Sequence, residues 1–350
     1  MGLPNILIEF KSKASTAIKR GNVGVVAVIV VETEKKGVFK LSDVTAIPKD
    51  LTADNKAYVE RTFLGGQKPV KYVQLICADS IDNALPLLET THFDYVAAPH
   101  DISSEDATKI ATLIKSMRDN KNIKVKAVLP NTKADHEGII NFTTTDIVVG
   151  EHTYTTAEYC SRIAGLLAGT PLTVSATYYV IPEIDDVPKF TKDELDKKID
   201  AGEFVIFHDG VKIKTGRAVN SLTTIGQEKS EDYKSVKIVD IMDLIYRDVR
   251  TTCEDSYIGK YANSYDNKCL LITAIQAYLE ALRNDDLLDQ NIETGIDMQA
   301  QTNYLKGKGE PVEEMSEYEI KSANTQTFVF LQSKFKILNA IEDISVKFFI

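Results

Sequence analysis

The stretch Gly202–Thr224, GEFVIFHDGVKIKTGRAVNSLTT, has the pattern of a β-hairpin followed by a polar loop. Phe204–Phe207 is a short apolar strand, and Asp209-Gly210 predicts the tight turn because this pair readily adopts positive φ angles. From Val211 to Thr215, residues suited to a buried face alternate with lysines, which is the period of a half-buried strand. We therefore expect a strand scaffold here, to which other strands are added.

The region from Leu51 to Gly150 alternates between segments with helical pattern and short apolar segments. We expect helices at 53–64, 80–89 and 103–119, and strands at 70–77, 93–98 and 123–129. Strands separated by helices of this length predict parallel pairing and a layered α/β structure. Nothing in the alternation itself distinguishes an enzyme from a structural protein.

The rest of the chain predicts further helices, of which those at 236–256 and 268–282 should pack on the hairpin, and two strands. We expect helices at 156–169, 191–201, 236–256 and 268–282, and strands at 317–323 and 327–338. The spacing Gly165-x-x-x-Gly169 predicts a close helix contact. The fold class is therefore α/β plus α+β: a βα-alternating domain followed by a β-hairpin sheet packed on helices. We expect four parts: an N-terminal arm and linker (1–20), an α/β domain (21–150), a core (151–326) and a C-terminal arm (327–350).

Candidate catalytic residues are few. His100-Asp101 follows an expected strand, where α/β proteins often place their sites, and His208-Asp209 lies in the hairpin turn. Neither has the context of a catalytic triad, and no glycine-rich phosphate loop follows a strand. Three aspartates could be read as a metal cluster: Asp240, Asp243 and Asp248. Their helical spacing favours a solvated helix face instead. We expect no catalytic residue, no cofactor site and no metal site.

Composition indicates an acidic globular protein. The 350 residues carry a formal net charge of −10, which disfavours general nucleic-acid binding because phosphate contacts need basic clusters. The four cysteines are widely spaced and predict reduced thiols: Cys77, Cys160, Cys253 and Cys269. We find no signal-peptide pattern and no apolar run of membrane-spanning length. We expect a protein that is made and kept in the cytosol, without membrane insertion, unless cell lysis releases it.

Both ends of the chain alternate apolar residues as strands do. Near the start these residues are Ile6, Ile8 and Phe10, and at the end they are Ile344, Val346, Phe348 and Ile350. Termini are usually polar and frayed. The free energy gained by burying four such side chains is about equal to the conformational entropy cost of ordering the strand. The strand therefore also needs the main-chain hydrogen bonds of a sheet edge. That edge belongs either to the same subunit or to a neighbour.

Several segments, in this order and spacing, resemble the tail sheath proteins of contractile phages. They are Ala164–Leu172, Tyr178, Ile181–Glu183, Asp200–Glu203, His208–Gly210, Arg217–Thr224 and Tyr257–Asn263. The chain is most similar to the short sheath proteins of Gram-positive myophages, defective prophages and phage-tail-like bacteriocins, clostridial ones especially. The resemblance is dense from Ala157 to Leu288.

The resemblance implies a structural subunit rather than an enzyme. Sheath subunits polymerise as stacked hexameric rings around a tail tube, contact baseplate and tail-terminator proteins, and contract to drive the tube through a cell envelope. The arms, here Leu3–Phe10 and Thr327–Ile350, would join a sheet in adjacent subunits. The implied acceptor includes four hairpin residues: Val205, Phe207, Val211 and Ile213. A cytosolic α/β enzyme and a non-contractile structural tail protein remain as alternatives.

Overall fold

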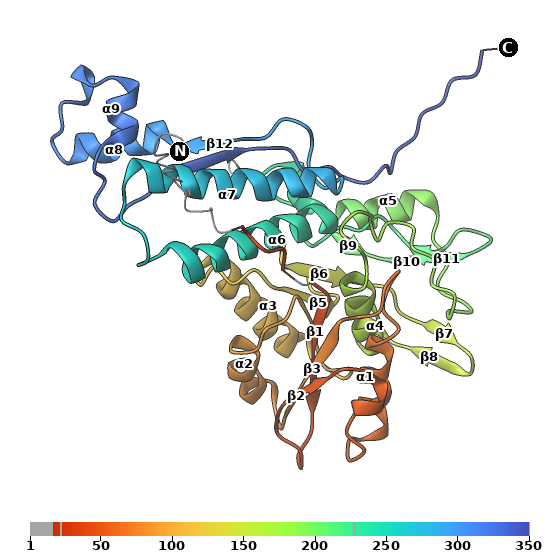
Figure 1. Ribbon diagram of the computed structural model, residues 1–350. Helices are drawn as coiled ribbons and strands as arrows, with labels where there is room; N and C mark the ends of the chain where they lie inside the picture. Colours follow the sequence, from red (N-terminus) through yellow and green to blue (C-terminus); the bar gives the residue numbers. More distant parts are fainter. Residues whose placement is uncertain (1–16, 22, 227–228, 350) are drawn as a thin grey trace, which may run out of the picture. The chain divides into compact units, whose positions relative to one another are not determined.

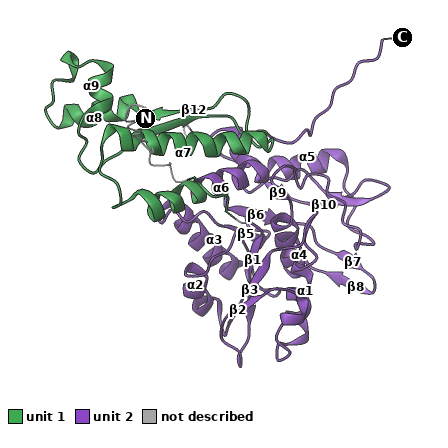
Figure 2. Cartoon of the chain, in the orientation of Figure 1, with its two compact units in different colours: residues 1–21, 247–338 green, residues 22–246, 339–350 purple. Residues whose placement is uncertain are grey.

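The chain forms two compact units (Figures 1 and 2). The computed structural model describes residues 17–21, 23–226 and 229–349. The sheet unit contains residues 22–246 and 339–350, and the helical unit contains residues 1–21 and 247–338. The chain therefore leaves the sheet unit after residue 246 and returns to it at residue 339.

A seven-stranded sheet lies at the centre of the sheet unit, in the order β2-β3-β1-β4-β5-β6-β9. Strand β2 is antiparallel to β3, and all other neighbours pair in parallel. The strands are β1 (Val25–Val31), β2 (Gly37–Leu41), β3 (Tyr72–Ala78), β4 (Tyr95–Ala97), β5 (Lys126–Pro130), β6 (Ile139–Phe142) and β9 (Glu203–Phe204). This arrangement confirms the parallel pairing predicted from the βα alternation.

Helices cover both faces of this sheet (Figure 1). Helices α1 (Ala53–Thr62) and α4 (Thr156–Ala168) pack on one face, and α2 (Ile81–Glu89) and α3 (Ser104–Asp119) pack on the other. Strand β1 contributes to both cores because its side chains alternate. Val26, Val28 and Val30 face α1 and α4, whereas Val25, Ala27 and Ile29 face α2 and α3.

Helices α1 and α4 approach each other closely at glycines. A Cβ atom on Gly165 would lie 2.1 Å from the carbonyl oxygen of Thr62. A Cβ atom on Gly169 would lie 2.3 Å from the backbone nitrogen of Gly66. The close helix contact predicted from the Gly-x-x-x-Gly spacing is therefore confirmed, and it lies where α4 meets α1 and the turn after it.

The hairpin predicted at 204–217 is present in the sheet unit as β10 (Ile206–His208) and β11 (Ile213–Thr215). In its turn, the Asp209 carboxylate accepts hydrogen bonds from the backbone of Val211 and Lys212, and Gly210 has a φ of +99°. His208 and Asp209 therefore shape the turn. A second hairpin, β7 (Ile147–Val149) with β8 (His152–Tyr154), and helix α5 (Lys192–Asp200) complete this unit.

In the described residues of the helical unit, the elements are helices and one two-stranded sheet. Helix α6 (Val236–Thr252) contains residues of both units, and the elements that follow are α7 (Tyr265–Asn284), β12 (Glu293–Ile296), α8 (Met298–Gly307), α9 (Glu317–Ser322) and β13 (Leu331–Lys334). Helix α7 contacts β12, and α8 contacts α9.

The strand predicted at 317–323 is wrong, because this segment is helix α9. Ser316 and Glu319 form a capping box, in which each side chain binds the backbone of the other residue. A Ser-x-x-Glu sequence is a helix-start signal, and it outweighs the strand-like character of the segment. Within the strand predicted at 327–338, only Leu331–Lys334 is a strand.

The expected domain boundaries lie at residues 150 and 326, whereas the two compact units are divided after residues 21, 246 and 338. Helix α4 and strand β9 lie after residue 150, yet they pack on or extend the same central sheet. Their contacts keep residues 151–246 in the sheet unit. None of the helices in the described ranges is both long and apolar enough to cross a membrane.

Candidate assembly elements

The C-terminal arm is exposed where the sequence alternates apolar residues. Ile344 is 77%, Val346 62% and Phe348 87% exposed. From 339 to 349 the chain forms no helix or strand, and Figure 1 shows it as an extended segment. Isolated apolar side chains at a surface are ordinary, but a run of them on one extended segment indicates an interaction site.

The other predicted arm residues lie outside the described part of the chain. Ile6, Ile8 and Phe10 belong to residues 1–16, and Ile350 is the last residue. The first part of the predicted C-terminal arm has a partner within its own chain. Strand β13 pairs with β12, and the backbone nitrogen of Leu338 donates to the carbonyl of Leu287.

The hairpin proposed as acceptor is largely engaged within the sheet unit. Val205, Phe207 and Ile213 are at most 9% exposed, whereas Val211 is 83% exposed. On one side, the nitrogen of Ile181 donates to the carbonyl of Ile213 at 3.0 Å. On the other side, the Thr144 hydroxyl binds both the nitrogen and the carbonyl of Ile206. Few backbone groups of this hairpin are left for an added strand.

The β12–β13 sheet offers more open edges. The two strands pair antiparallel from Glu293 opposite Lys334 to Ile296 opposite Leu331. Among the residues that the structure describes, no third strand joins this sheet. Its two outer edges therefore present backbone donors and acceptors, which is the geometry required for strand addition. Sequence reasoning missed β12 and its pairing with β13, since β12 has only four residues and contains a glycine.

A buried ion-pair network joins α6 to the central sheet within the sheet unit. Arg118 donates to both oxygens of Asp243, at 2.8 and 2.9 Å, and the Lys126 ammonium lies 2.7 Å from Asp243 and 2.9 Å from Asp240. Tyr95 donates its hydroxyl to Asp240 at 2.8 Å. The solvated face expected for these aspartates is therefore wrong, because their cationic partners come from α3 and β5.

The third aspartate is buried too, in the helical unit. Asp248 is 3% exposed, accepts from the Tyr278 hydroxyl at 2.8 Å and accepts from the backbone of Gly21 at 2.9 Å. The partners of Asp248 differ from those of Asp240 and Asp243. The three aspartates therefore make separate contacts and form no shared metal cluster.

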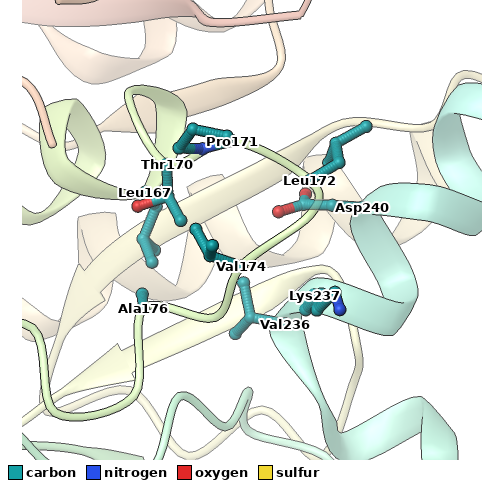
Figure 3. A pocket seen from close by; sticks show the side chains of 9 residues that line it. All are labelled: Leu167, Thr170, Pro171, Leu172, Val174, Ala176, Val236, Lys237 and Asp240. Carbon is teal, nitrogen blue, oxygen red and sulfur yellow. The ribbon is translucent and has the colours of Figure 1, made fainter. Parts of the chain in front are cut away.

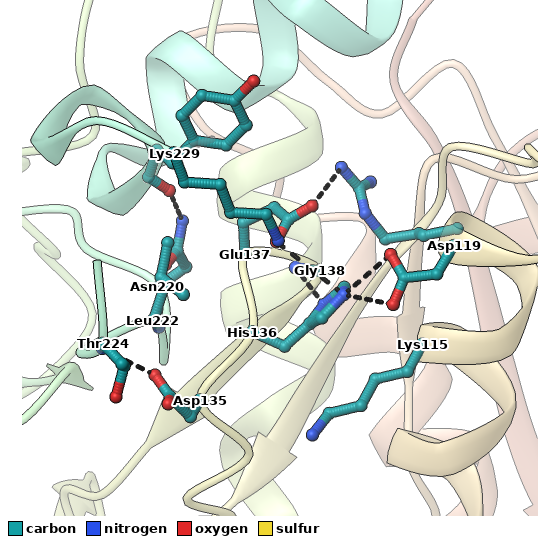
Figure 4. A network of polar contacts seen from close by, with 12 residues as sticks. Lys115, Asp119, Asp135, His136, Glu137, Gly138, Asn220, Leu222, Thr224 and Lys229 are labelled. Atoms are coloured by element: carbon teal, nitrogen blue, oxygen red, sulfur yellow. Dashed lines mark hydrogen bonds and ion pairs between the residues drawn. The ribbon is translucent and has the colours of Figure 1, made fainter. Parts of the chain in front are cut away.

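A second network holds the loop before β6 (Figure 4). The Asp119 carboxylate lies 3.2 Å from Nε2 of His136, and the Glu137 carboxylate lies 2.8 Å from the Lys229 ammonium. The possible metal-ligand atoms of Asp119, His136 and Glu137 lie within 4.8 Å of one another, which is close enough to bind one cation. Arg118 and Lys229 already neutralise Glu137, so this arrangement acts as an ion-pair network. Burial lowers the pKa of the His136 imidazole.

The polar loop after the hairpin is bound by this same region. Asp135 accepts a hydrogen bond from the backbone of Thr223 at 2.7 Å. It accepts a second from the backbone of Thr224 at 2.9 Å (Figure 4). Asn220 is fully buried, accepts from the nitrogen of Leu222 and donates to the carbonyl of Tyr233. The motif Arg217–Thr224 therefore includes residues that hold the hairpin to the sheet.

Comparisons with known proteins decide the family. Residues 75–221 match the phage tail sheath protein central domain, and residues 228–350 match the phage tail sheath C-terminal domain. The chain is 40% identical to a tail sheath protein of Clostridium phage phiCD119, over 99% of both chains. The chain belongs to the phage tail sheath family. The resemblance noted from its motifs is thereby confirmed.

Solved structures share the fold of this sheath protein. A sheath tail protein from Desulfitobacterium hafniense aligns with a TM-score of 0.69 at 16% identity, covering 84% of this chain and 94% of that one. The contracted helical sheath of the anti-feeding prophage aligns with a TM-score of 0.73 at 14% identity, covering 100% of this chain and 99% of that one. These likenesses show the fold, and the family match identifies the chain as a structural protein of a phage-type tail sheath.

Proposed function

We propose that this sheath protein polymerises as stacked hexameric rings around a tail tube, and that contraction of the stack drives the tube through a target cell envelope. Support comes from the family and from the fold, which aligns with the contracted sheath and with a baseplate assembly of the anti-feeding prophage. The partners in this proposal are further copies of the chain, the tube protein, and baseplate and tail-terminator proteins. Assembly takes place in the bacterial cytoplasm before lysis.

The exposed C-terminal arm is the observation that carries this proposal. Its side chains Ile344, Val346 and Phe348 alternate as on one face of a strand, and all are more than half exposed. An added strand gains main-chain hydrogen bonds as well as apolar burial. In the proposal, this arm and the N-terminal residues Ile6, Ile8 and Phe10 pair with sheets of adjacent subunits.

Two sheets compete as the acceptor. The hairpin of Val205, Phe207, Val211 and Ile213 is the acceptor indicated by the sequence, but Tyr179–Ile181 and Thr144 already bind its edges. The β12–β13 sheet has outer edges that no other described strand covers. These observations favour β12–β13, since a strand adds only to unpaired backbone groups.

The arms also explain how contraction can occur without dissociation. A head-to-tail contact that does not close on itself generates a helical stack. If strands tether neighbouring subunits, their compact bodies can move from an extended to a compact packing while the tethers stay paired. The work then comes from the new interfaces that form between subunit bodies in the compact state.

Disulfide trapping tests the acceptor. A cysteine replacing Phe348 would be combined with a cysteine replacing Glu293 on β12, Gln332 on β13 or Val211 on the hairpin, with Cys253 and Cys269 replaced by serine. Oxidation of assembled particles is expected to give ladders of covalent oligomers with a β12 or β13 cysteine. A ladder with Val211→Cys alone would assign the hairpin instead. No particles under any condition, including co-expression with a tube protein, would contradict the polymerising function.

A further inference from the structure

The C-terminal arm is attached to the sheet unit by an acidic pair. Ile341 and Ile344 are 86% and 77% exposed, whereas the Glu342 side chain between them is only 12% exposed. This reverses the ordinary preference, in which isoleucine is buried and glutamate faces water. Polar contacts must therefore hold the chain at this point.

The Glu342 carboxylate lies among hydroxyl and guanidinium donors. The Thr177 hydroxyl donates to Oε1 of Glu342 at 2.6 Å, and the Ser175 hydroxyl lies 3.1 Å from the same oxygen. Nε of Arg217 lies 3.5 Å from Oε2. Arg217 also donates from Nη2 to both oxygens of Asp343, at 2.7 and 2.8 Å. Hydrogen bonds with charged partners are stronger than neutral ones, so several of them can fix a short segment.

A second basic residue of the same unit, Lys237, feels the charge of Glu342 without contacting it. Lys237 lies at the start of α6, is 5% exposed and lines a pocket with Asp240, Leu172 and Val174 (Figure 3). Within the described ranges, its ammonium makes no hydrogen bond or ion pair. Burial lowers the pKa of Lys237, and the charge of Glu342 acts in the opposite direction. The positive charge of Lys237 therefore adds to the field around Glu342 without being a ligand of its carboxylate.

We propose that three side chains form a binding site for the Glu342–Asp343 pair that fixes the start of the C-terminal arm: Ser175, Thr177 and Arg217. The guanidinium of Arg217 thus faces both acidic groups. This site is here called the arm anchor, and seven residues, 344–350, follow it in the sequence. Seven extended residues span at most about 25 Å. If the arm pairs with a neighbour as in the proposed function, on which this step rests, the anchor limits the distance between Arg217 and the neighbour's acceptor edge.

Cleavage of the unassembled full-length chain tests the anchor without requiring a sheath. A glutamate-specific protease must take the Glu342 carboxylate into its own pocket, which requires that this carboxylate leave the anchor. We expect slow cleavage after Glu342 in the wild type, and cleavage at least tenfold faster in Arg217→Gln and in Thr177→Val, each of which removes a donor to the acidic pair. Mass spectrometry would identify the product that ends at Glu342.

Two matched controls distinguish release of Glu342 from the anchor from a general increase in protease sensitivity of the chain. Lys212→Gln removes one positive charge from the exposed hairpin turn and is expected to leave cleavage after Glu342 unchanged. Trypsin cleavage after Lys347, beyond the anchor, is expected to be fast and equal in all variants. Wild-type cleavage after Glu342 as fast as in Arg217→Gln would overturn the anchor. Protection in the wild type together with a failure to assemble would uphold the anchor and contradict the sheath proposal.

Discussion

Arg118 and Asp243 form a two-point ion pair, at 2.8 and 2.9 Å, between residues that are 125 positions apart in the chain. Both side chains are less than one-tenth exposed. The pair joins α3 to α6 inside the sheet unit, and Lys126 from β5 binds the same carboxylate. Buried charges are tolerated only when paired in this way, so the network is sensitive to the loss of any member.

Removal of the shared carboxylate should destabilise the sheet unit. Asp243→Asn leaves Arg118 without its two-point partner and weakens the pairing of Lys126. We expect a loss of about 3 kcal/mol in the free energy of unfolding, measured by urea denaturation. The control Asp196→Asn, on the exposed face of α5, should change it by less than about 0.5 kcal/mol. Equal effects of the two substitutions would contradict a structural role for the network.

The contribution of Asp243 should disappear in acid. Burial alone would raise the pKa of the Asp243 carboxyl, but Lys126 and Arg118 lower it to about 2. An unfolded aspartate is protonated below its ordinary pKa of 3.8. The ion pair therefore stabilises the fold above pH 4, and this contribution is lost as the pH falls towards 2. The difference in unfolding free energy between wild type and Asp243→Asn should shrink between pH 7 and pH 2.5. An unchanged difference would show that the carboxylate is not the stabilising group.

The contact of α1 with α4 should not tolerate a methyl group. In Gly165→Ala the new carbon would lie 2.1 Å from the Thr62 carbonyl oxygen, so the helices must separate. We expect a loss of about 1–3 kcal/mol and a lower Tm by calorimetry. Gly307→Ala, at the end of α8, places its methyl group in open space and should be neutral or slightly stabilising. A neutral Gly165→Ala would refute the close contact.

The start of α4 depends on a capping box. The Thr155 side chain accepts from the backbone nitrogen of Glu158, whose carboxylate accepts from the Thr155 nitrogen at 2.7 Å. Thr155→Ala should cost about 1 kcal/mol of unfolding free energy. The matched change Thr108→Ala, in the middle of α3, should cost little, because its hydroxyl only binds the preceding turn of its own helix. Similar losses of unfolding free energy at Thr155 and Thr108 would contradict a stabilising role for the cap.

Local patterns predict much of this fold. The Asp209-Gly210 turn, the βα alternation and the glycine spacing of α4 each depend on residues close in sequence, and each prediction is confirmed. Helix α9 is predictable in the same way, since Ser316-x-x-Glu319 is a capping signal, although the apolar residues of the segment favour a strand. Of these two local signals, the cap is the stronger because it satisfies backbone groups at the helix start.

Long-range pairing is beyond sequence reasoning. Asp240 and Asp243 have the helical spacing of a solvated face, and only their partners Arg118 and Lys126, more than 100 residues earlier, make burial possible. The β12–β13 sheet likewise joins segments nearly 40 residues apart. Periodicity within one element carries no information about which distant element neutralises a charge or supplies a strand.

The most direct test of the polymerising sheath is electron microscopy of particles formed with a co-expressed tube protein. Three chains would be compared: the full-length protein, a truncation after Asp343 that keeps the arm anchor, and Phe348→Ser with its neighbour Lys347→Ser as the matched control. We predict hollow cylinders from the full-length chain and from Lys347→Ser, and their loss in the truncation and in Phe348→Ser with the subunit still folded. Normal cylinders from the truncated chain would contradict the account, because subunits would then be joined without the C-terminal arm.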